Sequence, residues 1–142
     1  MKYVAVDYGM KRVGIAVSDP EEKFVFPLRT LHRETRAAFF EELLDLLNKE
    51  KAEAVVIGLP YNMDGSECLM TRQVRNFTAS LKRRIDLPVY WMDEELSSIS
   101  AEEELSAMGI GGRRKKEVLD QQAAVLILES FLAESVERRR LA

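Results

Sequence analysis

The sequence has very few of the side chains that build disulfides and zinc sites. Its 142 residues include one cysteine, Cys68, and one histidine, His32. A single cysteine cannot form a disulfide within the chain, so a cytoplasmic location is the default expectation. Structural and catalytic zinc is held mainly by cysteine and histidine, so a zinc site would have almost no ligands here.

Long apolar runs are also lacking. No segment approaches the ~18 consecutive apolar residues of a membrane-spanning helix. Residues 1–7 lead directly into a strand-like segment. They have neither the longer apolar stretch nor the cleavage site of a signal peptide. We therefore expect a cytoplasmic protein that has no membrane partner.

A large net charge of either sign is absent as well. The chain has 21 lysines and arginines against 24 aspartates and glutamates, a net charge of −3. This balance argues against a protein that coats nucleic acid by bulk positive charge, although it allows a local basic surface beside an acidic site. The length suits one domain with its own core, so we expect residues 1–142 to form a single domain.

Strand and helix patterns alternate along the chain. Apolar runs bounded by glycine or proline predict strands, and apolar residues at helical spacing predict helices. The predicted strands are residues 2–7, 13–17, 24–31, 54–58 and 89–92. The predicted helices are residues 35–51, 70–81, 98–108 and 116–137.

This order of elements predicts an α/β fold. The first three strands form an antiparallel meander, in which Pro27 favours an edge position for the third strand. Right-handed crossovers place strands 54–58 and 89–92 parallel to strand 2–7. We therefore predict a mixed five-stranded sheet, a three-strand antiparallel meander plus two parallel strands, with helices on both faces. That arrangement is the layout of the RNase H-like fold.

Three acidic positions occur where the fold would bring them together. Asp7 ends the first strand, the triplet Asp93-Glu94-Glu95 follows the last one, and Asp120 shares a face of the final helix with apolar residues. Each also has an ordinary explanation. Asp7 suits a turn, the triplet suits a solvated loop, and Asp120 suits a helix start, where an anion is favoured.

Taken together, the acidic positions favour a metal site. Clustered carboxylates repel one another unless a cation lies among them. Oxygen ligands select a hard ion, Mg²⁺ or Mn²⁺. Such an ion can activate water and stabilise charge in the hydrolysis of a phosphodiester. The spacing selects Asp7 and Asp120 but does not choose among the members of the triplet.

Four stretches of the sequence resemble the YqgF-type family, whose members are described as Holliday junction resolvases and as pre-16S rRNA nucleases. The resemblance covers nearly the whole chain. The matching stretches are Asp7 to Ala16 with Ser18-Asp19, Gly58-Leu59-Pro60 with Asn62 to Gly65, Asp93 to Ser98, and Lys115-Lys116 through Asp120 to Ala124.

The resemblance implies an RNase H-like nuclease with three acidic active-site residues. Carried over by position, they are Asp7, Glu94 and Asp120, which would hold Mg²⁺ or Mn²⁺. Where the family usually has an arginine after the glutamate, this chain has Glu95, and Ser97-Ser98 replace a threonine pair. The glycine-containing hairpin also resembles the phosphate-binding hairpin of actin-like and sugar-kinase ATPases. Those enzymes need two such domains, for which 142 residues leave no room.

Two basic segments are candidates for contact with nucleic acid. Lys11 and Arg12 lie in the first hairpin turn, where a solvated turn is an equal explanation. Arg113, Arg114, Lys115 and Lys116 come just before the predicted last helix, where cations oppose the helix dipole. We therefore interpret that segment as a phosphate-binding flap.

The resemblance favours processing of the 5′ end of pre-16S rRNA as the function. A Holliday junction resolvase acting on four-way DNA junctions and a non-catalytic nucleic-acid-binding factor are the alternatives. No residue pattern separates an RNA precursor from branched DNA as the partner. A two-fold-symmetric substrate would favour a homodimer.

Overall fold

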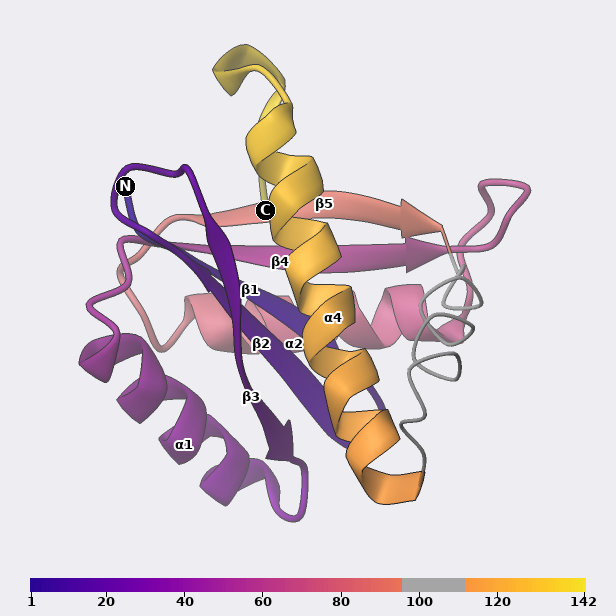
Figure 1. Cartoon of the computed structure of the whole chain (residues 1–142). Coiled ribbons are helices and arrows are strands. Elements are labelled where there is room, and N and C mark those ends of the chain that lie inside the picture. The colour runs from indigo at the N-terminus through magenta and orange to yellow at the C-terminus, as the bar shows by residue number, and fades with distance from the viewer. Residues whose placement is uncertain (96–111) are drawn as a thin grey trace.

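The buried strands of the sequence assemble into one mixed sheet. The structure is a computed structural model that describes residues 1–95 and 112–142 (Figure 1). Within these residues the sheet has six strands in the order β3-β2-β1-β4-β5-β6. In chain order the strands are β1 Tyr3–Tyr8, β2 Arg12–Ser18, β3 Val25–His32, β4 Ala54–Tyr61, β5 Val89–Glu95 and β6 Arg140–Leu141.

The strand directions confirm the predicted topology. β1 pairs antiparallel with β2, and β2 pairs antiparallel with β3. β1 pairs parallel with β4, and β4 pairs parallel with β5, so the carboxyl ends of these three strands lie at one edge of the sheet. Pro27 lies on β3, an edge strand, as predicted.

The sixth strand was not predicted. Arg140 and Leu141 pair antiparallel with Trp91 and Tyr90 of β5. Two residues are too few to produce an alternating pattern in the sequence. The prediction of five strands is therefore correct for the long strands and misses this short return of the chain.

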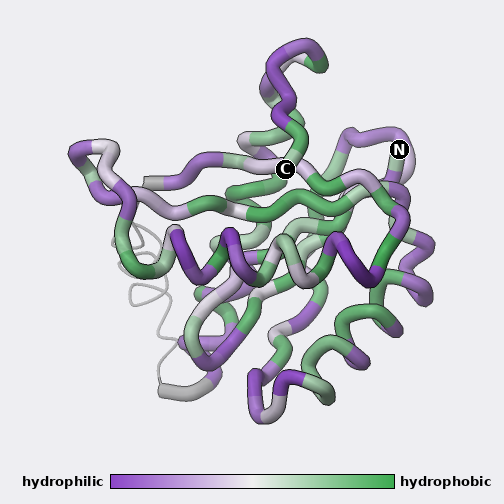
Figure 2. Tube along the Cα trace, turned by 180° about the vertical axis from the view of Figure 1, so that it is seen from behind, coloured by the Kyte–Doolittle hydropathy of each residue, from purple (hydrophilic) through white to green (hydrophobic). Residues whose placement is uncertain are grey.

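Helices cover both faces of the sheet, as predicted. In the described residues α1 Arg36–Lys49 and α2 Leu69–Lys82 lie on one face, and α4 Gly112–Ala133 crosses the other (Figure 1). Figure 2 shows the sheet from the α2 side, where apolar residues of α1 and α2 pack against it. Within the described residues no helix is both long and apolar enough to cross a bilayer.

The last helix differs from its predicted range of 116–137. It begins at Gly112, so Arg113 to Lys116 lie in its first turns and not before it. It ends at Ala133, after which the short 3₁₀ helix η1 Val136–Arg138 returns the chain toward β5. Glycine is tolerated at a helix start, and a 3₁₀ turn has almost the same apolar period as an α-helix. The predicted helix 98–108 lies outside the described residues.

Small side chains bring α4 close to the sheet. Ala5 and Ala16 on the sheet and Ala124 on the helix are fully buried. Ile127 and Phe131 continue the same buried stripe, which confirms the predicted inward face of this helix. The close packing places Asp120, one turn before Ala124, over Gly14 of β2.

Candidate active site

Asp7 lies at the carboxyl end of the central strand β1. Side chains alternate along a strand, and Tyr3 and Ala5 belong to the core under α4, so Asp7 faces α4 as well. Its neighbours on both sides are glycines. Gly14 is its partner on β2, and Gly58 follows Ile57, the partner of Val6 on β4.

Gly14 allows the backbone of α4 to approach the sheet beside Asp7. A Cβ atom at this position would overlap the main-chain carbonyl oxygen of Asp120. A main-chain atom cannot move aside as the end of a side chain can. Glycine on the strand is therefore the condition for Asp120 to lie next to Asp7.

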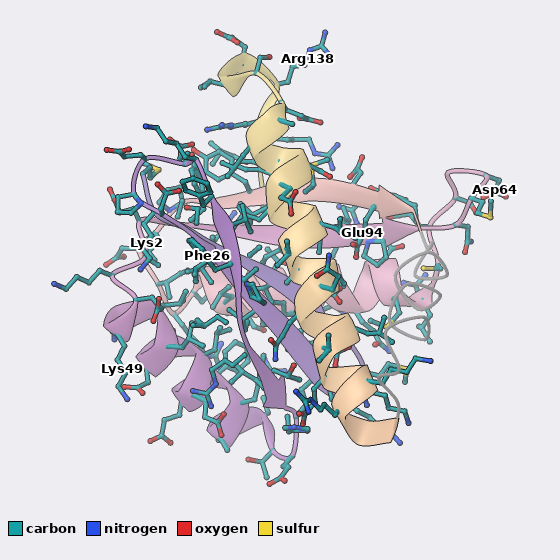
Figure 3. All side chains as sticks on the ribbon, in the orientation of Figure 1. Lys2, Phe26, Lys49, Asp64, Glu94 and Arg138 are labelled. Carbon is teal, nitrogen blue, oxygen red and sulfur yellow. The ribbon has the colours of Figure 1, made fainter. Side chains whose placement is uncertain are left out.

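Gly58 makes room for the third acidic residue. A Cβ atom there would lie 3.0 Å from Oε1 of Glu94 and would overlap Cδ1 of Ile127. The Glu94 carboxyl group, which extends from β5, therefore lies over Gly58 and beneath α4 (Figure 3). This placement brings Glu94 next to Asp7.

Asp7 and Glu94 share a hydrogen bond between their carboxyl groups, which requires a proton on one of them. Burial and the charge of Asp120 raise the pKa of Asp7 to about 7. Burial and the charge of Asp7 raise the pKa of Glu94 to about 8. The two carboxyl groups therefore titrate as a pair, and the pair keeps a proton near neutral pH.

Asp120 is close enough to Asp7 to raise its pKa, but its own carboxylate is bonded to a cation. Nε of Arg12 donates to Oδ2 of Asp120 over 2.7 Å. Burial raises the pKa of Asp120, while the hydrogen bond and charge of Arg12 act in the opposite direction. Arg12 thus holds the third carboxylate at the edge of the Asp7–Glu94 pair.

The carboxylate oxygens of these side chains suit a hard cation, but their positions do not form a complete metal-binding site. In the described part of the chain no three Asp, Glu, His or Cys side chains are grouped closely enough to hold a metal ion. Asp7 and Glu94 provide adjacent buried carboxyl oxygens, and burial together with neighbouring negative charge raises the pKa of both groups. Binding a cation there would displace the shared proton, and Asp120 could join by turning away from Arg12.

The acidic triplet after β5 divides into different environments. Asp93 is exposed, and its Oδ1 accepts from Nη2 of Arg140 over 2.5 Å, which ties β6 to β5. Glu94 faces the buried site, and the side chains of Glu95, Ser97 and Ser98 lie outside what the structure describes. Alternation along β5 separates Asp93 from Glu94, but the sequence does not reveal which of the two faces α4.

The predicted basic residues lie around this edge of the sheet. Lys11 is exposed in the β1–β2 turn, whereas Arg12 is engaged with Asp120. Arg114 and Lys116 are exposed in the first turns of α4, and Lys115 is half-buried there. The Arg113 side chain lies outside the described set.

The chain matches a family of known proteins over most of its length. The family model described as "RuvX: Holliday junction resolvase" matches residues 1–134, a range that contains Asp7, Glu94 and Asp120. The chain belongs to the RuvX family. The YqgF-type resemblance drawn from the sequence is thereby confirmed.

Curated members similar to this RuvX chain share about half of its residues. A protein of Nitratidesulfovibrio vulgaris named "Putative pre-16S rRNA nuclease" is 56% identical over 142 residues, which cover 100% of both chains. A protein of Maridesulfovibrio salexigens with the same name is 53% identical over 133 residues, 94% of this chain and 98% of that protein.

Solved structures show the same fold at much lower identity. Thermus thermophilus RuvC has a TM-score of 0.58 and 13% sequence identity, with 100% of both chains covered. Fowlpox virus resolvase, solved with Holliday junction DNA, has a TM-score of 0.52 and 11% identity over 94% of this chain and 100% of that one. The RuvX chain therefore has a RuvC-like α/β fold, which confirms the RNase H-like prediction.

Two features of the RuvX site were missed in the sequence. Gly58 was interpreted as part of a buried strand and of a stretch shared with the family, but not as a point of close approach, which a glycine inside a strand often marks. The ion pair between Arg12 and Asp120 joins residues 108 positions apart, and nothing in the local pattern indicates it.

Proposed function

We propose that this chain is a metal-dependent nuclease that cleaves phosphodiester bonds in structured nucleic acid, and that its substrate is the 5′ end of pre-16S rRNA. The observation that carries the proposal is the buried pair of carboxyl groups, Asp7 and Glu94, with Asp120 beside it. Two close relatives whose names refer to pre-16S rRNA support the choice of substrate.

In this proposal Asp7, Glu94 and Asp120 hold Mg²⁺ or Mn²⁺. The ion would activate water and stabilise the charge that develops on the phosphate. The chain contributes the geometry. Gly14 and Gly58 let the acidic residues converge, and Asp120, which Arg12 holds beside the pair, would turn away from Arg12 to reach the ion. Burial beneath α4 strengthens the electrostatic interactions of the carboxylates.

The direct test is a cleavage assay on a pre-16S rRNA precursor and a four-way DNA junction, run side by side with Mg²⁺ and with EDTA. We expect Mg²⁺-dependent cleavage of the precursor near the 5′ end of the mature rRNA. Preferential cleavage of the junction would favour a resolvase, for which we would expect a homodimer. Tight binding without cleavage of either substrate would contradict the proposed chemistry and favour a binding factor.

The stability of the metal-free protein is expected to decrease as the pH rises from about 5 to about 8. The native state keeps protons on Asp7 and Glu94, because their pKa values are about 7 and about 8 against ordinary values of 3.8 and 4.5. The unfolded chain has already released them, so each increase in pH favours unfolding. Chemical denaturation in EDTA across this range measures the effect.

The Glu94→Gln variant tests the assignment of this pH dependence. Between pH 5 and 8 the free energy of unfolding of the variant is expected to fall less steeply than that of the wild type, because the variant releases about one proton fewer on unfolding. Mg²⁺ affinity of the wild type should increase with pH by up to about tenfold per unit for each proton displaced. A wild-type stability that is constant or increases over the range would show that the pair is not protonated in the folded state.

Replacing Arg113, Arg114, Lys115 and Lys116 with Gln is expected to weaken nucleic-acid binding for all sequences alike. These cations lie in the first turns of α4, where they oppose the helix dipole, and a polyanion would compensate them. The log–log salt slope should decrease by roughly one unit for each phosphate that the variant no longer neutralises. Binding measured at several salt concentrations gives the slope. An unchanged slope relative to a fourfold variant of Lys23, Lys49, Lys51 and Arg138 would show that this segment does not contact phosphate.

A further inference from the structure

A row of aromatic rings with arginines at both ends lies on the face of the sheet opposite Asp7. The Tyr8 ring stacks on Phe77 with centroids 4.2 Å apart, and Phe77 stacks on Phe40 at 5.9 Å. The Arg33 guanidinium carbon lies 4.3 Å from the Tyr8 centroid, and that of Arg84 lies 4.2 Å from the Phe40 centroid. The rings therefore hold the guanidinium groups in fixed planes.

Ser80 gathers further arginines at the α2 end of this row. The buried hydroxyl group of Ser80 accepts from Nη2 of Arg36 over 2.7 Å and from Nη2 of Arg83 over 3.2 Å. Its main-chain oxygen accepts from Nη1 of Arg84 over 2.8 Å. Three guanidinium groups thus converge on one neutral residue.

Main-chain and hydroxyl oxygens, and no carboxylates of the described residues, accept the hydrogen bonds that these arginines donate. Nη1 of Arg33 donates to the main-chain oxygens of Gly9 and Met10 over 2.8 and 2.9 Å. Among the residues that the structure describes, none of the four arginines of this arginine–aromatic cluster, Arg33, Arg36, Arg83 and Arg84, forms an ion pair with Asp or Glu. Close cations without anions repel each other, and their remaining N–H groups can donate to an anionic ligand.

The arginine–aromatic cluster borders a small cavity. The cavity has a volume of about 240 Å³ and is lined by Tyr8, Phe39, Phe40 and Phe77 together with Arg33, Glu34, Thr35 and Arg36. This volume is below the roughly 300–1,000 Å³ of cofactor-sized pockets, so it suits a phosphate group or one nucleotide. Within the lining, two guanidinium groups outnumber the single carboxylate of Glu34.

The cavity also lies beside the catalytic edge of the sheet. Tyr8 directly follows Asp7, and their side chains point to opposite faces of β1. A nucleic-acid strand that passes around the carboxyl end of β1 can therefore contact both sites.

We propose that the arginine–aromatic cluster binds the phosphodiester backbone of the substrate strand at nucleotides that flank the cleavage position. Guanidinium groups match phosphate oxygens in paired hydrogen bonds, and fixed planes lose little entropy on binding. The inference rests on the proposed function in one respect, that nucleic acid is the substrate. It assigns a second contact surface, on the α1–α2 face, separate from the basic start of α4.

The test is binding of a labelled single-stranded segment of the rRNA precursor, measured in EDTA at several salt concentrations. The Arg36→Gln, Arg83→Gln double variant removes two cations that contact neither the Tyr8 ring nor a main-chain oxygen in this cluster. We expect affinity to fall by about tenfold at 0.1 M salt and the log–log slope to decrease by about 1.4, the value for two phosphate contacts on a single strand. The Arg36→Lys, Arg83→Lys double variant keeps both charges but loses the planar guanidinium groups. We expect it to keep the salt slope of the wild type but to have only part of its affinity.

The matched control is the Lys49→Gln, Arg138→Gln double variant. It makes the same change in net charge, and both residues are far from the cavity, at the end of α1 and in η1 (Figure 3). Equal binding by the two double variants, or no binding of RNA by the wild type, would overturn the inference. Because the assay contains no metal, it is independent of cleavage. A protein that binds through the arginines but cuts nothing would contradict only the proposed nuclease, and a protein that cuts without using them would contradict only this inference.

Discussion

Replacing Glu94 with Gln is expected to lower the rate of Mg²⁺-dependent cleavage by at least about a hundredfold. The change keeps the size of the side chain and removes the negative charge that Glu94 would carry once a metal ion had displaced the shared proton. Losing a residue that only supports a metal ligand typically costs about 10–100-fold, so the loss of a ligand should cost at least that much. Single-turnover cleavage of the precursor at saturating enzyme measures the chemical step without contributions from binding.

Asp93→Asn provides the matched control for Glu94→Gln. Asp93 is the adjacent acidic residue on β5, but it is exposed and bonded to Arg140. We expect its cleavage rate to stay within about twofold of the wild type, because a surface ion pair contributes little. Asp7→Asn and Asp120→Asn should lose activity as Glu94→Gln does. Full activity of any of these three variants would remove that residue from the proposed metal site.

Gly14→Ala is expected to have the largest effect on stability. The added Cβ atom would overlap the main-chain carbonyl oxygen of Asp120, so α4 would have to shift away from β2. Overpacking of this kind costs about 3 kcal/mol. For a chain of this size, that corresponds to a fall in melting temperature of roughly 10 °C, which a thermal melt in EDTA measures.

Alanine variants of two other glycines provide a comparison for the loss of stability in Gly14→Ala. At Gly65 nothing lies within 4 Å of an added Cβ atom, but φ is 84°, so Gly65→Ala should show only the smaller cost of backbone strain. At Gly58 the obstacles are the ends of the Ile127 and Glu94 side chains, which can move. Gly58→Ala should therefore reduce cleavage more than it reduces stability. A Gly14→Ala protein that melts at the wild-type temperature would contradict the close approach of α4 to β2.

Much of the fold was predictable because its signals are local. The buried strands, the amphipathic helices and Pro27 at the sheet edge follow from composition and period. The two-residue strand Arg140–Leu141 was not, because its position depends on pairing with β5. The ends of α4 were not either, because a glycine start and a following 3₁₀ turn leave the local pattern almost unchanged.

The candidate site was predictable only in part, for a similar reason. Asp7 stands out at the end of an apolar strand, and Asp120 stands out on an apolar helix face. Choosing Glu94 over Asp93 required the family resemblance, because both follow the same strand. The roles of Gly58 and Arg12 emerge only when β4, β5, β2 and α4 are placed together.

Asp7, Glu94 and Asp120 are expected to hold a divalent cation. The most direct test of this metal site is the anomalous diffraction signal of Mn²⁺ in a crystal of the protein, collected for the wild type and for Glu94→Gln. We predict a Mn²⁺ peak within bonding distance of the Asp7 and Glu94 carboxylates, with Asp120 turned from Arg12 toward the ion, and no such peak in the variant. A wild-type crystal saturated with Mn²⁺ that shows no peak between Asp7 and Glu94, or the same peak in Glu94→Gln, would contradict the claim.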